Sequence, residues 1–244
     1  MSSLRDRTTR LLERLEESQI LLVEWETSLW IQLGYPLAWD GSLFLLVPDH
    51  QLQRVRDLAI DIGLSPADED TLRPVYPCEA SRHAVRFLID ESTCTEGPLR
   101  RRLVFTPMSW TGITREEIVS PSAEDGFHNY PPLPSFIQTV PLSVACAALV
   151  RIAIREDRSS RLRTNVIETL SSVISNGLFD MSYEGEYMEL LPDEQPLSYE
   201  ELLEIENAEA EMLRWTFRRN EEWIREILIQ IVTGEKTYDD LPFA

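Results

Sequence analysis

One stretch of the chain decides the fold. It runs from Val23 to Gly63 and reads VEWETSLWIQLGYPLAWDGSLFLLVPDHQLQRVRDLAIDIG. Its centre, residues 42–47, is dominated by apolar side chains and ends at a proline, which predicts a strand buried on both faces. Residues 26–33 before it and 49–62 after it have helical spacing, and each segment is followed by a glycine. The stretch therefore predicts helix, strand and helix in that order.

The neighbouring segments extend this pattern into a small sheet. Residues 3–18 carry leucines spaced for one buried helical stripe, and residues 20–23 are a short apolar run typical of a buried strand. Two further strands are expected, over residues 83–90 and 103–106. The N-terminal part is thus expected to be a small mixed β-sheet with flanking helices.

The second half of the chain has a helical pattern. Residues 107–134 are irregular and contain proline-rich turns, so we place the domain boundary there. We expect an α/β domain over residues 1–130 and a helical domain over residues 131–244. The helices of the second domain are expected over residues 135–156, 160–176 and 198–232. The predicted fold class is therefore α+β, a small mixed sheet with flanking helices followed by a helical C-terminal half.

The last of these helices carries more apolar residues than a solvated helix can. Ser198 opens it, and Glu201 completes a capping box three residues later. Its apolar stripe changes line near Arg219 and Asn220, which predicts a kink or break there. This apolar stripe has to be buried, either against the preceding helices or against another chain.

The charge balance excludes some partners. The 244 residues include 23 Lys and Arg against 42 Asp and Glu, for a net charge of -19. Such a surface repels phosphate backbones and anionic lipid headgroups, so we expect neither nucleic acid nor a membrane as partner. The one basic run, Arg100–Arg102, is expected to flank a strand and keep its edge soluble.

The remaining composition points to a soluble cytoplasmic protein. Three cysteines and no Cys-x-x-Cys pair predict neither a disulfide framework nor a zinc site. Residues 1–18 form a charged amphipathic segment unlike a signal peptide, and the apolar run over 140–150 is too short to span a bilayer.

The order of the predicted elements matches one chemical pattern, that of nucleotidyl transfer, but the side chains that carry the chemistry differ. Nucleotidyl transfer uses two divalent metal ions, and a strand can hold them with two carboxylates placed two residues apart. A Gly-Ser at the start of the preceding helix meets the phosphates through backbone N–H groups. In this chain the two strand positions are Ser42 and Phe44, and the helix start reads Trp25-Glu26-Thr27-Ser28.

The stretch resembles a group of fungal nucleotidyltransferase-like proteins with a polymerase-beta-like fold. The matching residues are Trp25, Gly34-Tyr35-Pro36, Asp40, Leu45-Leu46-Val47-Pro48-Asp49 and Gly63, and Tyr35 departs from the family's valine. The resemblance implies a nucleotidyltransferase-like sheet with its metal positions at Ser42 and Phe44. Because Phe44 cannot bind a metal, we expect no metal, no cofactor and no catalytic residue of the family's kind.

Six residues are candidates for lining the cleft that the resemblance implies, the one that would hold the active site in a nucleotidyltransferase. They are Trp25, Glu26, Trp39, Asp40, Phe44 and His128, and Trp30 would join them if it faces inward. Asp40 is also interpreted as a turn residue before Gly41, and Asp49 as a helix N-cap. His50 and His83 are expected at the surface, and Cys146 in a core helix.

Three functions remain open. The leading hypothesis is a non-catalytic, nucleotidyltransferase-like protein that binds a protein partner or a small ligand. The first rival is an active transferase with a remodelled cleft using Glu26, Asp40 and His128, which requires converging carboxylates with strongly perturbed pKa values. The second rival is an oligomerising adaptor, which requires an exposed apolar stripe on residues 198–232. The oligomeric state is left open.

Overall fold

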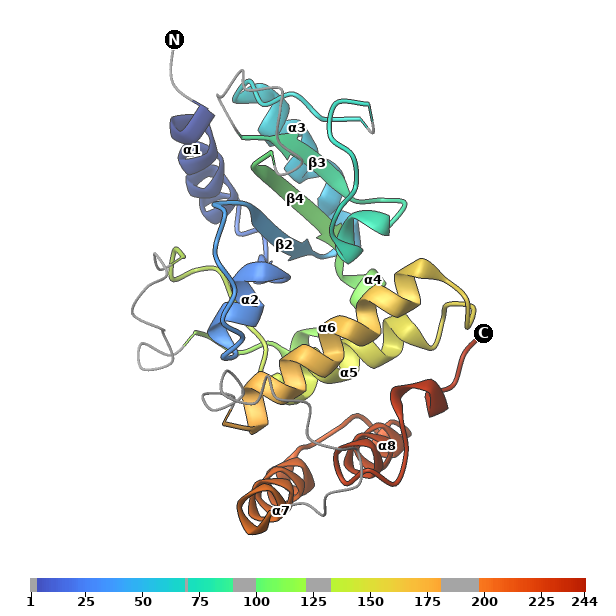
Figure 1. Ribbon diagram of the computed structural model, residues 1–244. Coiled ribbons are helices and arrows are strands. Elements are labelled where there is room, and N and C mark those ends of the chain that lie inside the picture. The colour runs from blue at the N-terminus through green and yellow to red at the C-terminus, as the bar shows by residue number, and fades with distance from the viewer. Residues whose placement is uncertain (1–3, 69, 90–99, 122–132, 181–197) are drawn as a thin grey trace. The chain divides into compact units, whose positions relative to one another are not determined.

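The computed structural model describes residues 4–68, 70–89, 100–121, 133–180 and 198–244 (Figure 1). The chain divides into two compact units. Unit 1 comprises Met1–Gln32 and Pro36–Pro141, and unit 2 comprises Leu33–Tyr35 and Leu142–Ala244. The boundary expected between residues 130 and 131 lies outside the described residues.

Unit 1 is built on a mixed sheet of four strands. They are β1 (Val23–Glu24), β2 (Leu43–Val47), β3 (Val85–Leu88) and β4 (Arg102–Pro107). Their order in the sheet is β1-β2-β4-β3, with β2 and β4 parallel and both outer pairs antiparallel. The predicted mixture of a small mixed sheet and helices is confirmed, although β1 begins at the last residue of the run expected over 20–23.

The helices of unit 1 follow the predicted order. They are α1 (Leu4–Glu17), α2 (Thr27–Gln32), α3 (Leu52–Asp61) and the short α4 (Met108–Thr111), with 3-10 turns η1 (Asp49–Gln51), η2 (Pro77–Ala80) and η3 (Arg115–Glu117). Gly63 has a φ of +91° and directly follows Ile62, the C-cap residue of α3. That left-handed conformation explains why a glycine ends this helix.

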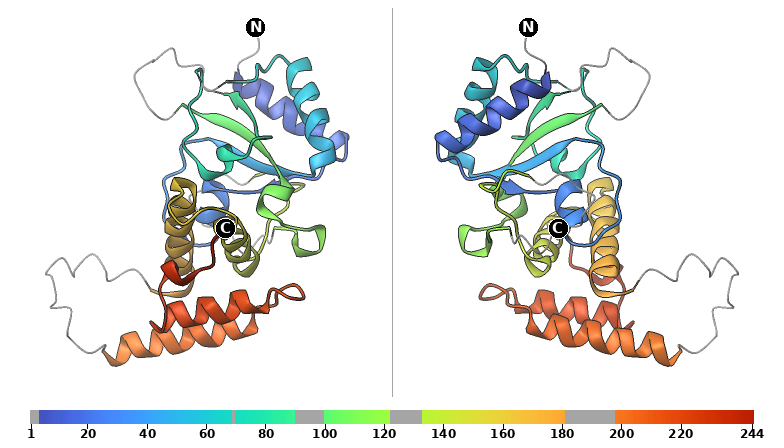
Figure 2. Two further views of the ribbon diagram at one scale, coloured as in Figure 1. Left: turned by 90° about the vertical axis from the view of Figure 1, so that its right-hand side faces the viewer. Right: turned by 90° about the vertical axis from the view of Figure 1, so that its left-hand side faces the viewer.

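The two faces of the sheet differ because side chains alternate along each strand. On the apolar face, Leu43, Leu45 and Val47 of β2 lie beside Leu103 and Phe105 of β4. Leucines of α1 and apolar residues of α3 cover this face, and Figure 2 shows both helices on the same side of the sheet. The other face, called here the polar face, carries the side chains discussed below.

Among the described residues, unit 2 consists of helices and turns without a strand. Its helices are α5 (Leu142–Ala153), α6 (Arg161–Leu178), α7 (Tyr199–Arg214) and α8 (Glu222–Val232), followed by the turn η5 (Tyr238–Asp240). The predicted capping box is confirmed, since Ser198 and Glu201 each accept a hydrogen bond from the other's backbone N–H group. None of the described helices has the length and apolar character needed to cross a membrane.

One of the predicted helical spans is wrong, and the break predicted in the last helix is confirmed. The helix expected over 135–156 starts at Leu142, because residues before Pro141 pair with other segments: the Gln138 carbonyl accepts from the Glu24 N–H at 2.8 Å. The last helix is not merely kinked but divided into α7 and α8. Asn220 lies in the connection with a φ of 72°, a left-handed conformation that a continuous helix cannot contain.

Candidate functional site on the polar face of the sheet

The polar face of the sheet contains a buried arginine. Arg102 is the first residue of β4, and its side chain is 1% exposed. The expectation that Arg100–Arg102 keeps a strand edge soluble is wrong for Arg102, because β4 lies between β2 and β3 and has no free edge. A buried guanidinium requires a partner, since an unpaired buried charge is very costly.

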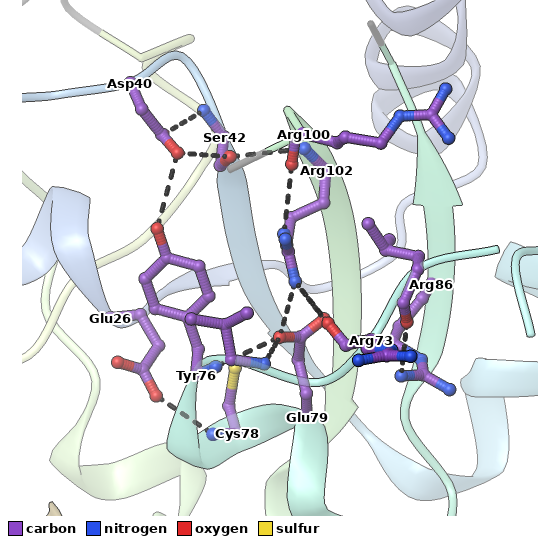
Figure 3. Close-up of polar contacts among 12 residues, drawn as sticks. Glu26, Asp40, Ser42, Arg73, Tyr76, Cys78, Glu79, Arg86, Arg100 and Arg102 are labelled. Carbon is purple, nitrogen blue, oxygen red and sulfur yellow. Dashed lines mark hydrogen bonds and ion pairs between the residues drawn. The ribbon is translucent and has the colours of Figure 1, made fainter. Parts of the chain in front are cut away.

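Glu79, in the turn η2, is that partner. The Arg102 Nη1 donates to both carboxylate oxygens of Glu79, at 3.0 and 2.9 Å, and the Glu79 side chain is fully buried. The backbone N–H groups of Val75 and Tyr76 also donate to Glu79, at 2.8 and 3.0 Å. Arg102 further donates to the carbonyl of Arg73 at 3.1 Å (Figure 3). Both charges are therefore paired and hydrogen-bonded, which is the condition under which a buried ion pair is tolerated.

A second set of hydrogen bonds adjoins this pair and begins at Asp40. The Asp40 carboxylate accepts from the Ser42 N–H at 2.7 Å, from the Ser42 hydroxyl at 3.0 Å and from the Tyr76 hydroxyl at 3.3 Å. The Ser42 hydroxyl in turn accepts from the backbone N–H of Arg102 at 3.2 Å. Asp40 is thus the turn residue that its sequence context predicts. Its carboxylate oxygens accept hydrogen bonds from Ser42 and Tyr76.

Aromatic contacts close this face around Phe44. The rings of Phe44 and Tyr76 lie 4.4 Å apart between centroids, and the Arg102 guanidinium lies 5.4 Å from the Tyr76 centroid. Burial and the negative charge of Asp40 raise the pKa of Tyr76 to about 12. The phenol therefore stays protonated and remains a donor to Asp40 at physiological pH.

Glu26 directly precedes α2. It is 4% exposed, and its carboxylate accepts from the Cys78 N–H at 3.0 Å and the Trp30 indole N–H at 3.4 Å. Burial raises its pKa from 4.5 to about 7, and Glu24, also buried, is raised to about 7 for the same reason. Glu26 has a φ of 54°, so it holds a conformation that is rare for residues other than glycine.

The cleft candidates fall into separate environments. Trp25 and Trp30 are both buried, with ring centroids 5.0 Å apart. Trp39 is half-buried against the apolar core, and its indole donates to the Ser42 carbonyl at 3.0 Å. His128 lies outside the described residues.

The structure brings Asp40 and Phe44 together, because both contact Tyr76. Glu26 contacts Cys78, which lies in the same turn as Glu79 (Figure 3). The side chains of Trp25, Glu26 and Phe44 are each at most 4% exposed. These candidates are therefore covered by the protein itself.

Other predicted roles have definite outcomes. Asp49 does not cap its helix, because it is the first residue of η1 and its carboxylate accepts from the backbone N–H and hydroxyl of Ser109. His50 and His83 are at the surface, as expected. Cys146 is buried in α5, as predicted, and burial raises the pKa of its thiol well above the ordinary value.

The sequence reasoning missed the residues that organise this face. Tyr76 and Glu79 are three residues apart at the start of η2, but Arg102 follows Glu79 by 23 residues, and no local motif links Arg102 to them. One signal was available: an arginine directly preceding an apolar strand has to pair if that strand is central. Its partner is set by the tertiary fold and has no counterpart in local spacing.

The metal chemistry of the resembled family does not fit these side chains. Ser42 is engaged by Asp40 and by the backbone of Arg102, and Phe44 presents a ring. Within the described ranges, no group of three or more His, Cys, Asp or Glu residues is arranged to hold a metal ion. We therefore derive no step through a metal at this site.

The described surface also carries hollows away from this network. One, of about 510 Å³, lies at the carboxyl ends of β2 and β4 and is lined by Asp49, Arg56, Arg82, His83 and Pro107, among others. Another, of about 410 Å³, is lined by residues from the end of α1 and from η3. Neither is lined by a predicted cleft residue.

Comparison with known proteins adds no identification: no family model, curated protein or solved structure matches the chain.

Proposed function

We propose that this chain is a non-catalytic, nucleotidyltransferase-like binding protein. A protein or small ligand would bind it without undergoing chemistry on the sheet. The observation that carries the proposal is the fate of the two strand positions. Ser42 is held by hydrogen bonds to Asp40 and Arg102, and the Phe44 ring packs against the tilted ring of Tyr76. Neither position can supply a carboxylate, and the surrounding side chains fill the place where a triphosphate and two ions would have to fit.

The burial of the perturbed carboxyl groups favours this proposal over the remodelled transferase. A raised pKa in a cleft is a mark of a catalytic acid or base, but buried structural groups show the same shift. Glu26 is 4% exposed and Glu24 is 6% exposed, and both carboxyl groups are already hydrogen-bonded within the protein, Glu26 to Cys78 and Trp30 and Glu24 to Ser28. A substrate would have to displace these contacts before either group could act as a base.

A turnover assay tests the proposal against that rival. Purified protein is incubated with each common nucleoside triphosphate and Mg²⁺ or Mn²⁺, and pyrophosphate release is measured. We expect the rate to equal that of buffer alone. Metal-dependent release that Glu26→Gln abolishes, and that the matched surface change Asp57→Asn leaves intact, would overturn the proposal in favour of a remodelled enzyme.

The adaptor hypothesis has its own supporting observation. The described helices of the predicted 198–232 segment do expose apolar side chains, and these gather on α7. A role as an adaptor is compatible with a non-catalytic sheet, because it concerns a different unit of the chain.

A further inference from the structure

Helix α7 has two apolar sides, and unit 2 covers only one of them. Ala208 and Met212 are at most 1% exposed and face the neighbouring helices, and α7 contacts both α6 and α8. Four large apolar side chains of the same helix are exposed instead: Tyr199 at 79%, Leu202 at 47%, Leu203 at 42% and Leu213 at 56%. We call these four residues the α7 outer stripe. Figures 1 and 2 show α7 lying beside α8.

The outer stripe lies along one side of the helix, with Tyr199, Leu202 and Leu203 at its start and Leu213 near its end. At about 100° per residue, its four members fall within an arc of roughly 100°, on the side opposite Ala208 and Met212. An arc of that width is the normal width of a helix face that packs against another helix. Single exposed apolar residues need no explanation, but a set aligned on one face marks an interaction surface.

The charges around the stripe select the kind of partner. α7 contains six glutamates and one arginine, and that arginine, Arg214, is paired with Glu211 at 2.9 Å. On the helical projection, Glu206 lies inside the arc of the stripe and Glu209 borders it. An apolar line with an acidic rim is complementary to a helix that has an apolar face and a basic rim.

The same charges disfavour two other occupants. A second copy of this chain carries a net charge of -19 and would set one acidic rim against another. Residues 181–197, which precede α7 and contain aromatic and aliphatic residues, include five acidic side chains and no lysine or arginine. Neither supplies the positive charge that the rim requires.

We propose that the α7 outer stripe docks a basic amphipathic helix from another protein. This proposal deepens the binding role proposed above by naming a partner class, although it rests on residues of unit 2 alone. Tyr199, Leu202, Leu203 and Leu213 bury the apolar face of the partner, and Glu206 and Glu209 meet its lysines or arginines. The mode is that of a helix laid along an apolar face and read through residues spaced three and four apart.

A direct binding measurement tests this assignment. The probe is a fluorescein-labelled peptide of about 18 residues, built of leucine and lysine with all leucines on one helical face, a length at which a helix can form. A second peptide has the same composition in an order that scatters the leucines. We expect fluorescence anisotropy to show that the full-length protein binds the first peptide at least about tenfold more tightly than the second.

Matched variants locate the binding. Leu202→Ala/Leu203→Ala should weaken binding of the amphipathic peptide about tenfold without changing the net charge or the thermal midpoint. The control Ile60→Ala removes a side chain of α3 that is 45% exposed and should leave affinity within about twofold. Glu206→Gln should weaken binding and flatten its dependence on salt.

Two results would overturn the assignment. Equal binding of both peptides, or no effect of Leu202→Ala/Leu203→Ala, would mean that the acidic surface attracts the peptide without the stripe. A concentration-dependent dimer in sedimentation, abolished by Leu202→Ala/Leu203→Ala, would show that the α7 outer stripe binds a second copy of this chain. Failure here leaves the turnover assay unaffected, and activity in the turnover assay leaves the peptide result standing, so the two proposals fail separately.

Discussion

The two faces of the sheet in unit 1 are buried to a similar degree but by different means. The apolar face is filled by aliphatic and aromatic side chains of β2, β4, α1 and α3. The polar face is closed by the Arg102–Glu79 pair and by the hydrogen bonds of Asp40, Ser42 and Tyr76. An apolar face tolerates changes that keep its volume, whereas a buried polar face fails when one member is removed and its partner stays. The two faces should therefore respond differently to substitution.

The largest expected effect comes from breaking the buried pair. Arg102→Met leaves the Glu79 carboxylate buried beside only backbone donors, and we expect it to lower the free energy of unfolding by about 3–5 kcal/mol. Urea unfolding followed by circular dichroism measures the change. The control is the exposed pair of Arg14 and Glu17, in which Arg14→Met should cost less than about 0.5 kcal/mol.

The double variant Arg102→Met/Glu79→Leu sharpens the same test. Removing both charges leaves no unpaired carboxylate, so the double variant should be more stable than Arg102→Met alone. A double variant that loses the full sum of the two single losses would mean that the pair is not coupled, and the polar face would not be the unit described above.

A substitution on the apolar face should lower the free energy of unfolding somewhat less, and that loss should not depend on pH. Leu45 is 1% exposed at the centre of β2, so Leu45→Ala is expected to cost roughly 2–5 kcal/mol through lost burial and an unfilled cavity. Urea unfolding at several pH values measures both features. A loss below about 0.5 kcal/mol, the usual size of a surface effect, would contradict the central position of β2.

The polar face should also respond to pH through Glu26. Its pKa of about 7 lies above the ordinary value of 4.5, so the folded state binds this proton more tightly than the unfolded state does. The contribution of Glu26 to stability is therefore greatest at low pH and falls as the pH rises from about 5 to 8.

Glu26→Gln isolates that contribution. Its stability relative to the wild type should rise by up to about 3 kcal/mol between pH 5 and pH 8. The matched surface variant Asp57→Asn should change by less than about 0.5 kcal/mol over the same range. A constant difference between Glu26→Gln and the wild type would show that the pKa of Glu26 is the same in the folded and the unfolded protein.

The smallest expected effect concerns one hydroxyl group. Tyr76→Phe keeps the ring against Phe44 but removes the donor to Asp40, so it should cost about 1 kcal/mol. Tyr76→Ala removes the ring as well and should cost about 3 kcal/mol or more. Equal losses for the two variants would show that the ring contact contributes nothing to closing this face.

The sequence predicted the apolar face well and the polar face poorly. Residues 42–47 could be placed because apolar alternation and a terminal proline are local signals, and the glycine after α3 marks its end in the same way. The pairing of Arg102 with Glu79 depends on where β4 lies in the sheet, which no local pattern records. The same limit explains Asp49, whose carboxylate was expected to cap its own helix and binds Ser109 sixty positions away.

In the candidate site, too, the sequence predicted local features but not the tertiary contacts. Asp40, Phe44 and Glu26 could be selected from the sequence because they lie in the segment that resembles nucleotidyltransferase-like proteins. Their burial could not be foreseen, because the turn with Tyr76, Cys78 and Glu79 has only local start signals, Pro77 and Glu79, and these do not record what it packs against. Selecting these positions from the sequence did not reveal what surrounds them in the fold.

Calorimetric titration with Mn²⁺ and ATP tests most directly whether the polar face is a closed structural network rather than a metal site. The full-length protein is titrated with ATP in the presence and in the absence of Mn²⁺. We expect no heat beyond dilution in either case, because Ser42 and Phe44 supply no carboxylate and the face is filled by Tyr76 and Arg102. Saturable binding with micromolar affinity and one-to-one stoichiometry that requires Mn²⁺ would contradict it.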